Sequence, residues 1–256
     1  MPPATPPVRQ EEPARETALT LAEHLDELRR RLGIGFAALL VGVALAATQA
    51  ERLVGWLQRP AASRLPHFAF FSPTEPLMAY LTVSVLGGLC VAMPVILWQV
   101  WAFVRSGLTA RERAVGRVFV WWGSAQFLAG VLLAYYVLVP VALRVLLAIG
   151  RAQFDPVISI DRYLCFVTGI VFWSGVTFEL PVVLSLLASV GVVTPEWLRQ
   201  HRPMAVLSLV IVAAIVTPTT DPINLLLMAV PMVGLYELSI LATRWAMPPR
   251  PRATQD

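Results

Sequence analysis

Charged residues are scarce in this sequence, and lysine is absent. Only 14% of the 256 residues are charged, whereas 57% are hydrophobic. A soluble domain carries about 25% charged and about 45–50% apolar residues. The chain therefore has too little polar surface for a water-soluble body, and lipid must cover much of it. Its 20 basic residues are all arginines, and they lie between apolar runs rather than along one face, which argues against nucleic-acid binding.

Cysteine and histidine are too rare to suggest a disulfide framework or a metal centre. Cys90 and Cys165 fall inside apolar segments without metal-ligand spacing, so we expect both to be small buried hydrophobes. His24, His67 and His201 lie far apart in the sequence. The sequence also lacks the G-x-S-x-G, H-E-x-x-H, P-loop and C-x-x-C motifs. We therefore expect no enzymatic activity and no cofactor.

Six apolar segments predict an all-α integral membrane protein with six transmembrane helices. They cover about residues 32–49, 77–104, 118–139, 163–190, 204–216 and 223–236. Each of the last two would reach only roughly 20 Å, short of a hydrocarbon core of about 30 Å. We expect these two short helices to form a hairpin that stops within the membrane or thins it.

Polar segments flank this membrane domain, which we place at residues 20–243. Residues 1–19 are rich in proline, glutamate and arginine and predict a disordered cytoplasmic tail, and residues 244–256 predict a second cytoplasmic tail. Leucines at positions 21, 25, 28 and 32 predict an amphipathic helix that leads directly into the first span. A cleaved secretory signal is the alternative here, but the long acidic segment before the span argues against it.

The arginine distribution predicts that both termini lie inside the cell. With the N-terminus inside, fourteen arginines fall on inner segments and six on outer ones. An even number of spans agrees with this orientation. Prolines such as Pro94, Pro140 and Pro181 lie within or at the ends of the spans, where they bend helices. Kinked helices of this kind suit a concave, cup-like body.

Charged side chains at the start of the first span form the first candidate site. Asp26 and Arg30 stand four residues apart, as do Glu27 and Arg31, and such helical ion pairs are worth about 0.2–0.5 kcal/mol each. A salt-bridged membrane anchor is the simpler explanation. However, Glu112 follows the second span and faces the same side of the membrane as Glu27. Two carboxylates there could receive a cationic ligand through bidentate guanidinium contacts.

Glu179 is the second candidate, because it lies inside the fourth span. A carboxylate there costs at least about 2.5–3.5 kcal/mol on insertion scales, so it usually faces protein or water and serves a function. Counted from the same membrane face, Gln126 in the third span differs from Glu179 in depth by only about 7 Å. We expect the two to form one polar patch within the bilayer. A neutral Glu179 bonded to Gln126 for purely structural reasons is the alternative.

Taken in order, these motifs resemble the TatC family over about residues 21–243. The N-terminal signature His24–Leu32 is followed by Pro73 and Pro76, by Met93–Phe103, by Gly107-Leu108 before Arg111-Glu112-Arg113, by Gly175–Pro181, by Thr217-Pro218 with Asp221 and Asn224, and by Leu235–Glu237. The sequence departs from the family's pattern at Ser106, where proline is usual, and at Trp98, where tyrosine is common.

The resemblance implies a non-enzymatic receptor in the bacterial inner membrane. It implies binding of twin-arginine signal peptides of folded cargo at the cytoplasmic face, self-association in a receptor complex, and export driven by the proton-motive force with TatA- and TatB-type single-span partners. The residues implied are Glu27, Glu112, Leu28, Arg29, Phe103 and Arg113 for the signal peptide, Glu179 and Gln126 for partner docking, and Pro76, Pro94, Pro181 and Asp221 for structural or periplasmic roles.

A small proton-coupled secondary transporter is the alternative function. It would use Glu179 as its protonatable group, but such transporters usually contain internal repeats, and no convincing repeat relates the two halves of this sequence. A lipid-handling enzyme would need a nucleophile–base pair, for which the sequence offers no plausible candidate.

Overall fold

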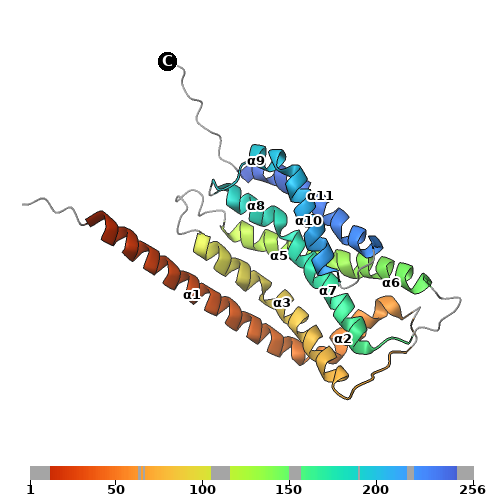
Figure 1. Cartoon of the computed structure of the whole chain (residues 1–256). Helices are drawn as coiled ribbons and strands as arrows, with labels where there is room; N and C mark the ends of the chain where they lie inside the picture. Colours follow the sequence, from red (N-terminus) through yellow and green to blue (C-terminus); the bar gives the residue numbers. More distant parts are fainter. Residues whose placement is uncertain are drawn as a thin grey trace, which may run out of the picture.

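The structure is a computed structural model, and almost all of its described part is helical (Figure 1). The described residues are 12–62, 65, 67–104, 116–149, 157–189, 191–217 and 222–246. Five of the helical segments are long and apolar enough to cross a membrane, and a sixth apolar helix is shorter. An isolated β-bridge between Ala69 and Ser159 joins two loop segments at one end of the bundle. The all-helical membrane architecture predicted from the sequence is therefore present.

Helix α1 (Glu12–Ala47) joins the predicted amphipathic helix and the first span in one continuous element. The predicted disordered tail at residues 1–19 is therefore wrong from Glu12 onward, whereas residues 1–11 lie outside the described part. Pro13 falls in the first turn of this helix, where a proline is tolerated, so the composition of this segment is compatible with a helix.

Helix α1 packs along α3 (Glu75–Val104) and lies at one edge of the molecule (Figure 1). The two helices touch backbone to backbone at Gly42 and Gly88. A Cβ atom added at Gly42 would lie 2.5 Å from the carbonyl oxygen of Gly88, and one added at Gly88 would lie 2.5 Å from the backbone nitrogen of Val43. Only glycine permits this approach.

Part of the segment between the first two predicted spans, residues 50–76, is helical. Helix α2 (Ala50–Gln58) continues into a short 3-10 turn (Arg59–Ala61). The hydroxyl of Tyr163 donates a hydrogen bond to the carbonyl of Leu57 at 2.7 Å, and that of Tyr135 donates to the carbonyl of Trp56 at 2.8 Å. These bonds hold α2 across the end of the bundle opposite the N-terminal arginines.

The third span is longer than predicted. Helix α5 (Gly116–Leu133) passes through a π-helical segment (Ala134–Leu138) into α6 (Val139–Ala148). The predicted end of this span at about residue 139 is therefore wrong. Pro140 is the second residue of α6 and follows the π-helical segment directly, so it lies within a continuous helix and does not end it.

The fourth span is broken at Glu179 into α7 (Ile160–Phe178) and α8 (Leu180–Ser189). Pro181 has no backbone N–H, so it cannot donate to the carbonyl of Thr177. At the break the N–H of Glu179 donates to the carbonyl of Val176, three residues earlier, at 3.1 Å. The bend expected from Pro181 therefore falls next to the buried carboxylate.

The last three helices are α9 (Pro195–Gln200), α10 (Arg202–Val216) and α11 (Pro222–Ala246). With 15 residues, α10 is short, as predicted. The predicted short span at 223–236 is wrong, since α11 has 25 residues and continues past Glu237. Arg202 donates to Glu237 at 2.6 Å, and the hydroxyl of Tyr236 donates to the carbonyl of Leu198 at 2.7 Å. These contacts with α10 and α9 stabilise the part of α11 that follows its apolar segment.

Two buried clusters form the core, one mainly between α3, α6, α7 and α11 and the other between α3, α5 and α8. Phe127, Leu164 and Val167 are among their fully buried side chains. Both cysteines are free thiols, but Cys90 is only half-buried and Cys165 is exposed on the protein surface. The expectation that both would be buried is therefore wrong, because an apolar residue in a membrane protein can face lipid instead of the core.

Candidate functional site

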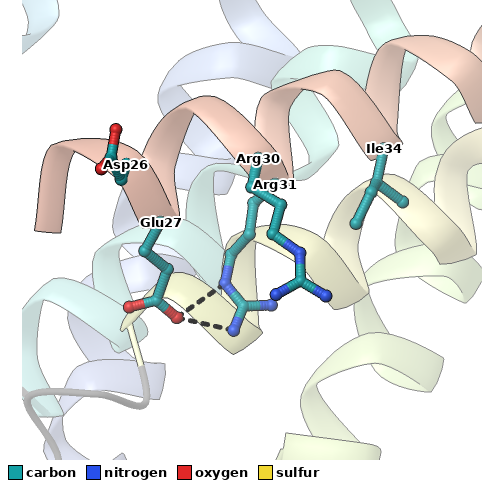
Figure 2. Close-up of a pocket in the computed structure, with 5 residues that line it drawn as sticks. All are labelled: Asp26, Glu27, Arg30, Arg31 and Ile34. Atoms are coloured by element: carbon teal, nitrogen blue, oxygen red, sulfur yellow. Dashed lines mark hydrogen bonds and ion pairs between the residues drawn. The ribbon is translucent and has the colours of Figure 1, made fainter. Parts of the chain in front are cut away.

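Glu27 and Arg31 form the ion pair that their spacing on α1 predicts. The Nε and Nη2 atoms of Arg31 donate to Oε1 of Glu27 at 2.9 and 2.6 Å (Figure 2). A third donor, Nη1 of Arg31, contacts Oε1 of Gln99 on α3 at 3.4 Å. The side chains of Arg31 and Glu27 are 21% and 31% exposed, so the pair is partly buried at the seam between α1 and α3.

The second predicted pair, Asp26 with Arg30, is wrong. Among the described residues no ion pair joins them, and Figure 2 shows Asp26 pointing away from the guanidinium groups. Both residues are exposed. An exposed ion pair gains little energy and loses side-chain entropy, so spacing alone does not ensure that it forms.

A hollow of about 450 Å³ lies beside the Glu27–Arg31 pair, lined by Asp26, Glu27, Arg30, Arg31 and Ile34 (Figure 2). The ring of Phe103 on α3 stacks on that of His24, with ring centroids 4.5 Å apart. The structure therefore brings Phe103 to the same end of α1 as Glu27.

The other residues predicted for this site have different outcomes. Leu28, Arg29 and Phe103 line an adjacent groove between α1 and α3. Glu112 and Arg113 lie outside the described residues, so their proximity to Glu27 stays a prediction.

Glu179 is buried at the contact between the α7–α8 break and α5, with a relative exposure of 6%. A Cβ atom added at Gly123 would lie 3.1 Å from its Oε2 atom, so the absence of a side chain on α5 makes room for the carboxylate. Neither carboxylate oxygen has a hydrogen-bond partner among the described residues. An unpaired acceptor in such a setting is costly, which favours a functional role.

Gln126 lies three residues after Gly123, about 4.5 Å further along α5. Its amide oxygen is buried without a hydrogen-bond partner in the described part of the chain, as is the hydroxyl of Ser124. Gln126 therefore lies about one helical turn from the glycine that faces Glu179. The structure shows no hydrogen bond between Gln126 and Glu179, although the purely structural explanation requires one. The sequence analysis did not identify Gly123 or Ser124 as part of this site, although they lie only three and two residues before Gln126.

Three of the predicted structural residues lie at helix ends or bends. Pro76 is the second residue of α3, Pro94 lies inside α3, and Pro181 is the second residue of α8. Asp221 lies outside the described residues. In the part of the chain that the structure describes, no three His, Cys, Asp or Glu side chains gather as metal ligands.

The sequence matches a family model described as Sec-independent protein translocase protein (TatC) over residues 23–231. The chain belongs to the TatC family. It is similar to a protein named TatC from Aquifex aeolicus, with 37% identity over 88% of this chain and 97% of that protein. It is also similar to one from Koribacter versatilis, with 36% identity over 87% of this chain and 84% of that protein.

Solved TatC structures agree with this assignment. One of them, described as the crystal structure of the twin-arginine translocase receptor TatC, has a TM-score of 0.79 to this structure at 35% identity. The match covers 87% of this chain and 99% of the other. It extends over most of the helical body that carries Glu27 and Glu179, so both candidate sites lie on a TatC fold.

Proposed function

We propose that this TatC-family chain is the receptor and scaffold of a twin-arginine translocase, and that it binds the arginine pair of signal peptides through Glu27 and Glu112. The observation that carries the proposal is the burial of the Glu27 carboxylate and its contact with a guanidinium group. This carboxylate is partly buried at the rim of a hollow and already engages a guanidinium group, that of Arg31. Solved relatives described as a twin-arginine translocase receptor support the assignment.

The chemistry of Glu27 suits a second guanidinium. Arg31 contacts only Oε1, so Oε2 can accept from a ligand, and the ligand can also displace Arg31. Hydrogen bonds to charged groups contribute about 1.5–3 kcal/mol each. Glu112 would provide the second carboxylate for the second arginine. Because each arginine presents a planar fork of donors, two lysines would fit the same carboxylates less well.

Neighbouring side chains would bind the rest of the peptide. Leu28 and Phe103 offer apolar surface next to Glu27, and both line the groove between α1 and α3. Arg29 lines the same groove, and Arg113 would follow Glu112 in the loop. These two arginines would bind acidic or carbonyl groups that flank the arginine pair.

We infer that Glu179 and Gln126 form a docking site for single-span TatA- or TatB-type partners. The buried acceptors on these residues have no donor among the described side chains, and a polar group on a partner helix would supply one. The same unpartnered acceptors would also suit a proton-coupled secondary transporter, which is the second candidate function, with Glu179 as the group that takes up a proton. Such a transporter would have no affinity for twin-arginine peptides.

The proposal includes an orientation and an assembly. Both termini would lie on the cytoplasmic side of the inner membrane, in agreement with the arginine distribution. Several copies would associate in a receptor complex, each with a concave surface formed by its bent helices. Export would use the proton-motive force, and the chain itself would catalyse no reaction.

Peptide binding to the purified protein tests the receptor function. A labelled twin-arginine peptide should bind the unaltered chain, and a twin-lysine version should bind more weakly. The double variant Glu27→Ala/Glu112→Ala should lose at least about a hundredfold in affinity, as expected for the loss of two charge-assisted contacts. Glu237→Ala is the matched control, since it removes another ion-paired carboxylate from the surface. Unchanged affinity in the double variant would remove both glutamates from the proposed site.

A further inference from the structure

An open apolar groove runs along the seam between α1 and α3, next to the Glu27–Arg31 pair. It encloses about 680 Å³. Its walls are Leu28, Leu32, Phe36 and Leu39 from α1, with Ile96 and Val100 from α3. Leu32 and Phe36 are 71% and 60% exposed, so the groove opens to the side rather than into the core.

Glycines determine where the groove is open. At Gly42 the backbone of α1 touches that of α3, which closes the seam. Gly33 and Gly35 line the groove about two to two and a half turns earlier, and a Cβ atom added at either would meet nothing within 4 Å. Gly35 lies on the same face of α1 as Gly42, so its missing side chain leaves space beside α3, and the exposed Gly33 adds open space at the outer edge of the groove.

The size of the groove fits lipid tails. From Leu28 to Leu39 is about 16 Å of helix, which equals one leaflet of a hydrocarbon core of about 30 Å. Two extended hydrocarbon chains of that length, each about 4 Å across by carbon contact distance, occupy roughly 400 Å³. A helix of the same length, about 10 Å across, occupies roughly 1,300 Å³, which exceeds the volume of the groove.

Positive charge lies at one end of the groove only. Arg29 and Arg31 line that end, and the rest of the lining is apolar apart from Gln99. Arg29 is exposed and has no ion pair among the described residues, whereas Arg31 is shared between Glu27 and Gln99. With Asp26, Glu27 and Arg30 included, the cluster carries a net charge of about +1, and basic groups beside an apolar segment attract anionic lipid headgroups.

We propose that the groove binds one anionic glycerophospholipid, with its tails between α1 and α3 and its phosphate at Arg29. The lipid fills the space that the two glycines leave and stabilises the otherwise sparsely supported end of α1. Leu28, Arg29 and Phe103 also belong to the proposed peptide site, so the lipid would occupy the groove when no peptide is bound there. The inference itself requires neither Glu112 nor a signal peptide.

Native mass spectrometry of the protein released from nanodiscs of mixed phosphatidylglycerol and phosphatidylcholine tests this proposal. The unaltered chain should retain one phosphatidylglycerol in preference to phosphatidylcholine. The double variant Gly33→Leu/Gly35→Leu places side chains in the groove at positions where an added Cβ atom meets nothing within 4 Å. It should bind phosphatidylglycerol about tenfold more weakly, as expected when about two methylene groups lose their contact. The control Gly169→Leu/Gly234→Leu also adds side chains at open helical glycines, but away from the groove, and should bind as the unaltered chain does.

Arg29→Gln tests the headgroup separately. It should weaken phosphatidylglycerol binding about fivefold, in line with one arginine's attraction to an anionic surface, and leave phosphatidylcholine binding unchanged. Equal retention by the glycine double variant would overturn the proposal, as would equal binding of the two lipids by the unaltered chain. A photo-crosslinker at position 35 that forms adducts with protein rather than lipid would show that a partner helix occupies the groove instead.

Discussion

Arg31 binds one carboxylate oxygen of Glu27 with two of its nitrogens and leaves the other oxygen without a partner among the described residues. The chain therefore places its own guanidinium where the proposed ligand would place one. Binding of a signal peptide would then be an exchange in which an arginine of the ligand replaces Arg31 or joins it on the same carboxylate.

Replacing Arg31 with glutamine should tighten the binding of a twin-arginine peptide. Removal of the internal competitor should raise the affinity about twofold to fivefold, since a partly exposed ion pair is worth about 0.2–1 kcal/mol. Titration of a labelled peptide against the purified variant measures the change. Arg202→Gln, which breaks the ion pair with Glu237, should leave the affinity unchanged. Weaker binding by Arg31→Gln would mean that Arg31 contacts the peptide directly.

The Glu27–Arg31 pair could be predicted because its geometry is local to one helix. Residues four apart on a helix lie on one face, and this pair is also held by Gln99 of α3. Asp26 and Arg30 have the same spacing but no such support, so the same rule failed there. Local spacing determines which contacts are possible, and neighbouring helices determine which of them form.

The extent of the helices was harder to predict for the same reason. Apolar patterning placed α3 within two residues of its observed start, but it ended the last span near Tyr236, where charge begins. Arg202, which continues the helix by pairing with Glu237, is 35 residues away in the sequence. Such a partner cannot be identified from a hydropathy pattern. The contact between Glu179 and Gly123 was also hidden, because a glycine gives no signal of what it makes room for.

Replacing Glu179 with methionine should stabilise the protein while it abolishes export. Both carboxylate oxygens are buried without a partner in the described structure, and an apolar side chain of similar volume removes that cost. We expect the free energy of unfolding to rise by about 1–3 kcal/mol. Thermal unfolding in detergent measures the first effect, and export of a twin-arginine reporter measures the second.

Ser174→Ala is the contrasting control for this prediction. Ser174 is a buried polar residue of α7 whose hydroxyl donates to the carbonyl of Gly130 on α5 at 3.0 Å. Its loss should destabilise the protein by about 0.5–1.5 kcal/mol. If Glu179→Met destabilises the protein as Ser174→Ala does, then Glu179 has a structural partner and its proposed role in docking is wrong.

Alanine at Gly42 and alanine at Gly35 should change stability in opposite directions. At Gly42 the added Cβ would lie 2.5 Å from the Gly88 carbonyl oxygen, so α1 and α3 must move apart, at a cost of about 1–3 kcal/mol. At Gly35 the added Cβ meets nothing within 4 Å, and the higher helix propensity of alanine should stabilise the protein by up to about 1 kcal/mol. Thermal unfolding of both variants provides the comparison. Equal effects would mean that the helices do not cross at Gly42.

Single cysteines should reveal which end of the bundle faces the cytoplasm. In a chain with Cys90 and Cys165 replaced by alanine, Glu23→Cys and Gln200→Cys mark the arginine-rich end, whereas Gln49→Cys and Val157→Cys mark the opposite end. All four positions are exposed, so accessibility depends on the side of the membrane. A membrane-impermeant maleimide added to intact spheroplasts should label only positions 49 and 157, and positions 23 and 200 should react after the membrane is opened. The reverse pattern would place Glu27 outside the cell, where it could not meet a signal peptide before export, and would contradict the receptor proposal even if the purified protein binds the peptide.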